Sequence, residues 1–181
     1  MALDEEAERR SLCEWQPHLE SRSFEVKSPT DRGYNCIAWA AGDDTKIWSP
    51  AVAVGGKRLG GYYWPDAPTL PTVTAAEALF ERRGYVRTHV GDTSVEPGVE
   101  KIAIFGYDSM GLLTHAARQC ASGRWSSKMG DNADIEHTLR DIEGGIFGEV
   151  RSLMRKDPKV ESFPSDPPPH LIVVERRARD N

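Results

Sequence analysis

Three short runs in the middle of the chain constrain its fold most strongly. They cover residues 101–108, 112–120 and 124–130, and each has the length of a single β-strand. The second and third runs are separated only by the turn Ala121-Ser-Gly123. Short runs that are joined by tight turns pair as neighbouring antiparallel strands. The sequence therefore predicts an antiparallel sheet in this region.

Helices are expected before and after these strands in the chain. Residues 4–15 are charged and predict a short helix, and residues 34–42 are small and apolar and end in a glycine, as a buried capped helix does. Residues 74–84 begin with a capping-box pattern. In 134–143 the apolar residues recur at helical spacing. A further short element is expected at 147–156.

The length and the apolar content fit one domain. The chain has 181 residues, 39% of them hydrophobic, which is enough for one core but short for two. We expect an N-terminal segment at 1–15, the domain proper at 16–156, and a C-terminal spacer at 157–181. The spacer contains the proline-rich stretch 165–169 and then a short apolar strand at 171–175.

Composition excludes several classes of function. The net charge is −5 and the basic residues are scattered, so nucleic acid is not an expected partner. No apolar run reaches the length of a signal peptide or a spanning helix, which predicts a cytoplasmic protein that does not enter a membrane. Secretion by a route that needs no cleavable signal stays open. Cys13, Cys36 and Cys120 are widely spaced and odd in number, so neither disulfides nor a zinc site are expected, and no other metal or organic cofactor is implied.

Cys36 and His115 are the candidates for chemistry. A thiol becomes a nucleophile when it ionises, and the positive end of a helix favours ionisation. Cys36 lies in the first turn of the expected helix at 34–42. His115 lies near the head of an expected strand, where a rigid sheet would present it as a base. Cys13 and Cys120 are interpreted as structural.

Four motifs carry a resemblance to known enzymes. They are Tyr34–Ala40 (YNCIAWA), Thr114–Gln119 (THAARQ), Trp125–Gly130 (WSSKMG) and Asp134–His137 (DIEH). Their order resembles the NlpC/P60 and CHAP branches of the papain-like superfamily, and more narrowly an uncharacterised bacterial family placed beside them. The resemblance covers residues 15–156. It implies an α+β papain-like fold, in which a nucleophile helix packs on an antiparallel sheet.

The sequence departs from the better-known branches at two places. Asn35-Cys36-Ile37 stands where NlpC/P60 enzymes usually have Asp-Cys-Ser, and the hairpin carries Ser127 and Lys128 where they commonly have a second histidine. Ser127, Asp131 and Asp134 therefore compete to orient the imidazole. A carboxylate stabilises an imidazolium better than a hydroxyl does, so Asp134 is preferred.

Other side chains have supporting roles in this hypothesis. Asn35 or the backbone amide of Cys36 is a candidate for an oxyanion hole. Trp64, with Tyr62 and Tyr63, either lines a groove or belongs to the core, and the sequence does not decide. His137 either caps or pairs within its expected helix or supports the site. Arg118 and Lys128 lie on neighbouring expected strands and could bind an acidic group of a substrate, but charged side chains on strands usually face solvent, and this is the expectation for both.

Together these features predict a cysteine-dependent hydrolase. Cys36 would attack a peptide, amide or other acyl substrate, His115 would handle the proton, and water would release the acyl-enzyme. A non-catalytic binding module on the same fold and an acyltransferase are the alternatives. The oligomeric state, the bond cleaved and the biological process stay open, because one fold supports many functions.

Overall fold

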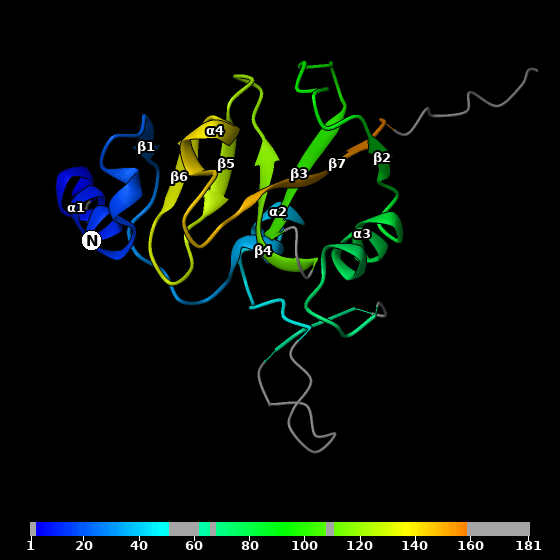
Figure 1. The fold of residues 1–181 in the computed structure, drawn as a ribbon, viewed down its shortest axis with the longest axis horizontal. Helices are drawn as coiled ribbons and strands as arrows, with labels where there is room; N and C mark the ends of the chain where they lie inside the picture. Colours follow the sequence, from blue (N-terminus) through cyan, green and yellow to red (C-terminus); the bar gives the residue numbers. More distant parts are fainter. Residues whose placement is uncertain (1–2, 51–61, 66–67, 108–110, 159–181) are drawn as a thin grey trace, which may run out of the picture.

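A computed structural model describes residues 3–50, 62–65, 68–107 and 111–158. Within them, one β-sheet runs through the molecule and short helices lie around it (Figure 1). The elements in chain order are α1 (Glu5–Trp15), a 3₁₀ turn (Pro17–Leu19), β1 (Phe24–Val26), α2 (Cys36–Ala40), α3 (Val73–Glu81), β2 (Val86–Thr88), β3 (Glu100–Tyr107), β4 (Leu112–Gln119), β5 (Trp125–Lys128), β6 (Asp134–His137), α4 (Leu139–Ile142) and β7 (Glu149–Lys156).

The sheet has seven strands in the order β1-β6-β5-β4-β3-β7-β2. Every neighbouring pair of these strands is antiparallel. Strands β3, β4 and β5 follow one another in the chain and in space, which confirms the sheet predicted for the three central runs. In the register of β3 and β4, Phe105 lies opposite His115 and Ile104 lies opposite Ala116.

The expected α+β papain-like fold is wrong. The described chain is a β-rich fold dominated by the antiparallel sheet, and α2 is only five residues long. Residues 134–137, expected to be helical, form β6 between β5 and β1, and residues 149–156 form β7. The apolar spacing in 134–143 wrongly predicted one helix, because strand β6 and the single turn α4 are each too short to show a period of their own.

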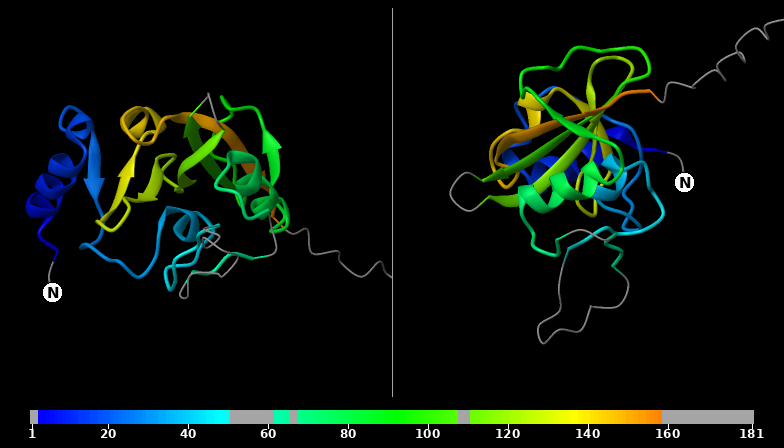
Figure 2. Two further views of the ribbon diagram at one scale, coloured as in Figure 1. Left: turned by 60° about the horizontal axis from the view of Figure 1, so that its bottom comes forward. Right: turned by 90° about the vertical axis from the view of Figure 1, so that its right-hand side faces the viewer.

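The sheet carries apolar side chains on both faces. One face packs under α2 and α3 and includes Ile102, Ile104 and Ala116; we call it the α2/α3 face. The other carries Ala103, Phe105, Ala117, Trp125 and Ile135 and is covered by Leu12, Leu19, Ile142 and Phe147; we call it the α1/α4 face. Figure 2 shows α2 and α3 together on one side of the sheet, with α4 on the other. Alternate residues of β3 and β4 therefore enter different cores.

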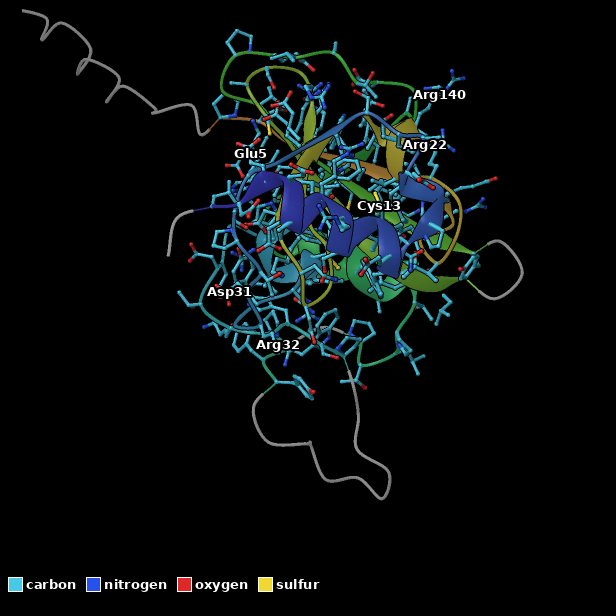
Figure 3. The ribbon with its side chains drawn as sticks, turned by 90° about the vertical axis from the view of Figure 1, so that its left-hand side faces the viewer. Glu5, Cys13, Arg22, Asp31, Arg32 and Arg140 are labelled. Carbon is cyan, nitrogen blue, oxygen red and sulfur yellow. The ribbon has the colours of Figure 1, made fainter. Side chains whose placement is uncertain are left out.

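Helix α1 closes the β1 edge of the sheet (Figure 3). Asp4 caps it by accepting a hydrogen bond from the Ala7 amide at 3.1 Å, and Leu12 is its buried residue. The Arg9 guanidinium donates to the backbone carbonyls of Phe24 and Arg22, both at 3.0 Å. The helix predicted for 4–15 is confirmed. The expected strand at 171–175 lies outside the described residues.

Candidate functional site

Cys36 is the first residue of α2, and Asn35 sets its position. The Asn35 side-chain oxygen accepts from the Ala38 amide at 3.1 Å and from the Trp48 amide at 3.2 Å, and its Nδ2 donates to the Trp48 carbonyl at 2.7 Å. This is an N-cap that also ties the helix to the following loop. Both ends of the Asn35 carboxamide are thus engaged in holding the loop to the helix, with one of the two Nδ2 hydrogens bound to Trp48. The Cys36 side chain is half-buried.

His115 lies on the opposite face of the sheet from Cys36. Its ring packs 4.7 Å from the Phe147 ring and 5.6 Å from the Phe105 ring, on the α1/α4 face, and the residue is 1% exposed. The next residue, Ala116, points instead toward α2. Neighbouring residues of a strand point to opposite faces, so the strand that contacts α2 turns His115 away from it. The structure does not bring the expected pair together.

Burial moves both groups away from the charged states that a thiolate and imidazolium pair requires. It raises the pKa of the Cys36 thiol, although backbone amides including that of Ala116, together with the Lys128 ammonium, act in the other direction. It lowers the pKa of His115 to about 3, assisted by repulsion from His137. The thiol and the imidazole are therefore both neutral near neutral pH.

Asp134, the expected orienting carboxylate, lies on the α2/α3 side of the sheet. It sits opposite Lys128 in the pairing of β5 with β6, and its Oδ2 accepts from the Tyr34 hydroxyl at 2.6 Å. It is 4% exposed, and burial raises its pKa. Its other oxygen, Oδ1, has no hydrogen-bond partner among the described residues. Asp134 thus supports Tyr34 rather than His115, while the alternative carboxylate, Asp131, is exposed and forms an ion pair with Arg32 at 4.0 Å.

Ser127 binds a different histidine from the one expected. Its Oγ lies 2.8 Å from Nε2 of His137, and Nδ1 of His137 lies 2.8 Å from the Thr138 carbonyl. A carbonyl only accepts, so Nδ1 carries the proton and Nε2 accepts from the serine hydroxyl. Ser127 and His137 are fully buried, and burial lowers the pKa of His137 to about 4. This resembles a serine and histidine dyad in geometry, but neither side chain is exposed to solvent.

Contrary to the expectation, Lys128 does not face solvent. It is fully buried on β5, where its ammonium donates to the Gly130 carbonyl at 2.8 Å and to the Asn132 carbonyl, and lies 5.2 Å from the Tyr34 ring centroid. These contacts close the turn between β5 and β6. Burial lowers the pKa of Lys128, and the nearby Asp134 charge opposes this change.

The remaining candidates also have structural contacts. Trp64 is 4% exposed in the α2/α3 core and donates to the Pro68 carbonyl at 3.1 Å, so it does not line a groove. The Arg118 guanidinium stacks 3.8 Å from the Trp39 ring centroid, and Trp39 donates to the Ser126 hydroxyl at 3.0 Å. The four sequence motifs therefore contact one another. The motif at 34–40 contacts the motifs at 114–119, 125–130 and 134–137, and the last two of these contact each other.

The structure also contains a cleft of about 530 Å³. It lies between α4, the loop after β2 and the turn between β4 and β5, and we call it the α4 cleft. Its lining residues are Val90, Gly91, Thr93, Gly123, Trp125, Thr138, Leu139, Arg140, Glu143 and Val150. Sequence analysis selected none of these as site residues. No sequence signal marks the cleft, because its walls come from the loop after β2, the turn between β4 and β5, α4 and β7, which only the folded sheet brings together.

The described residues contain neither a metal-binding cluster nor a membrane-spanning helix. No group of three or more histidine, cysteine, aspartate or glutamate side chains there has a geometry that would hold a metal ion. None of the helices in the described part of the chain is long and apolar enough to cross a membrane.

Fold and site together define a β-rich domain whose motif residues tie a single sheet to its flanking helices. Residues 25–155 match a family described as "Domain of unknown function (DUF7689)", and the chain belongs to this family. No curated protein matches the chain. No solved structure matches it either.

Proposed function

We propose that this domain is a binding module. One observation carries the proposal: Cys36 begins α2 on one face of the sheet, while His115 lies among phenylalanine rings on the other. A base must reach the proton that it removes, directly or through one water molecule. A β-sheet between thiol and imidazole prevents this.

Two further observations support the proposal. The polar groups that the hydrolase hypothesis needed are used to hold the fold, as the contacts of Asn35, Ser127 and Asp134 show. The α4 cleft has a volume of about 530 Å³, which lies within the range of small-ligand pockets, roughly 300 to 1,000 Å³. We assign the binding site to this cleft.

Alkylation of the thiols tests the non-catalytic assignment. Cys13 provides an internal reference, because it too is half-buried and burial raises its pKa. We expect iodoacetamide at about pH 6.5 to label Cys36 no faster than Cys13, with both rates rising toward about pH 9 as the thiols ionise. Mass spectrometry of the labelled peptides measures both rates. The binding-module proposal fails if Cys36 reacts faster at the lower pH and slows in His115→Gln.

A second candidate is thiol chemistry at Cys36, as a hydrolase or acyltransferase on a peptide, amide or other acyl substrate. It is favoured by the half-buried thiol at the start of α2, near the backbone amide of Ala116 and the charge of Lys128. Turnover of an aryl acetate ester tests this candidate. It requires turnover that Cys36→Ser abolishes and Cys13→Ser keeps, and equal turnover in these two variants rules it out.

A further inference from the structure

We infer that the α4 cleft binds a small organic monocarboxylate with an apolar body, an inference that rests on the proposed binding function. The floor of the cleft is apolar. Trp125 is 2% exposed and belongs to the core of the α1/α4 face, and Leu139 and Val150 pack against that core. On the loop wall, Val90 is 43% exposed. A ligand that covers these groups removes apolar surface from water.

One cation in the cleft is available to a ligand. Arg140 is exposed and forms no ion pair with any residue in the described ranges; Figure 3 shows it on α4 at the outer side of the molecule. Guanidinium groups bind carboxylates through two parallel hydrogen bonds. Arg140 is therefore the group that would select an acidic ligand.

The other polar groups of the cleft limit the charge of that ligand. The Glu143 carboxylate accepts from the Val150 amide at 3.3 Å, and the Thr138 hydroxyl donates to Asp141 at 2.7 Å. Glu143 lines the same wall of the cleft as Arg140. One guanidinium opposed by one carboxylate suits a monoanion and disfavours a phosphate dianion. The cleft thus fits an apolar body of modest size that ends in a carboxylate.

Titration calorimetry on the full chain tests this inference, with 4-phenylbutyrate as the probe at about pH 7. We expect 4-phenylbutyrate to bind and Arg140→Gln to weaken it about fivefold, because a charged hydrogen-bond donor is lost. The uncharged 4-phenyl-1-butanol should bind more weakly and respond little to Arg140→Gln. Arg82→Gln, an exposed arginine outside the cleft, is the matched control and should change nothing.

A second pair of variants tests the location. Val90→Asp places a negative charge on the wall of the cleft and should abolish binding, whereas Val86→Asp, at an exposed valine on β2 outside the cleft, should leave it unchanged. Both positions are exposed, so both variants should fold. Equal effects of the two variants would overturn the inference.

Two other results would also overturn it. One is the absence of binding by both 4-phenylbutyrate and indole-3-acetate at about 5 mM, and the other is tighter binding of phenyl phosphate than of 4-phenylbutyrate. Neither result changes the rates of thiol alkylation. The monocarboxylate inference can therefore fail while the binding-module proposal stands.

Discussion

At the scale of single residues, Lys128 shows how a charged side chain in a strand becomes a structural group. Its ammonium is buried, but two turn carbonyls accept from it and Asp134 lies opposite in the neighbouring strand. A buried charge is tolerated when it is paired and hydrogen-bonded, and removing one partner leaves the others unsatisfied. Sequence alone does not reveal this, because lysine in a strand usually faces solvent.

We predict that Lys128→Met lowers the free energy of unfolding by about 3 kcal/mol, since it leaves the two carbonyls without a donor and Asp134 without a cation. Methionine keeps most of the volume, so packing on Tyr34 changes little. Urea unfolding measures the effect. Lys27→Met is the control, because Lys27 forms exposed ion pairs, and its loss should change stability far less than the loss of Lys128. Similar small losses for both would show that Lys128 does not hold the turn.

At the scale of elements, strands β4 and β6 each place a neutral histidine in the α1/α4 face. Burial holds the pKa of His115 at about 3 and that of His137 at about 4. In the unfolded chain a histidine titrates at about 6.5. Between the folded and the unfolded pKa values, the two histidines are therefore neutral in the folded state and protonated in the unfolded state. The stability that this neutrality provides is complete above about pH 6.5 and is lost as the pH falls toward the folded values.

This sets a pH dependence that can be measured. As the pH falls from about 6.5 to about 4.5, each buried histidine should lower the free energy of unfolding by about 1 kcal/mol per pH unit, because the unfolded state gains a proton that the folded state does not. His115→Phe removes one of these groups and should reduce the slope without abolishing it, because His137 and His18, whose pKa values burial also lowers, still contribute. His89→Gln, at an exposed histidine, is the control. Carboxyl groups also titrate at the acid end, so the informative quantity is the difference between variants. A slope that His115→Phe leaves unchanged would contradict the assignment.

At the scale of the whole molecule, one sheet separates two hydrophobic cores, one on each of its faces. Leu12 of α1 is fully buried on one face, and Leu79 of α3 is 1% exposed on the other. Strands β3 and β4 contribute side chains to both cores, so a loss on either face should propagate through the sheet.

We predict that Leu12→Ala and Leu79→Ala each lower the free energy of unfolding by about 3 kcal/mol, through lost burial and the cavity left behind. Each variant should unfold in one transition, at the same midpoint by circular dichroism and by tryptophan fluorescence. Ala7→Gly, on the exposed side of α1, should cost only about 1 kcal/mol. Separate transitions by the two probes in either leucine variant would show that the faces fold independently.

The sequence by itself determined the features that depend on neighbours in the chain. These are the antiparallel β3, β4 and β5, marked by strand-length runs and one tight turn, the charged helix α1, and the small apolar helix α2 that begins at Cys36. The helix predicted for 74–84 is likewise observed as α3, which starts one residue earlier after a Thr72 cap.

Only the tertiary structure decided how these elements face one another. His115 and Ala116 are adjacent in the chain, and the one that meets Cys36 depends on which face of β4 receives α2. A strand alternates its faces at every residue, so an error of one position inverts the site. The strands β6 and β7 form because they exchange backbone hydrogen bonds with partner strands in the sheet. The α4 cleft exists because the fold brings the loop after β2 and the turn between β4 and β5 beside α4 and β7.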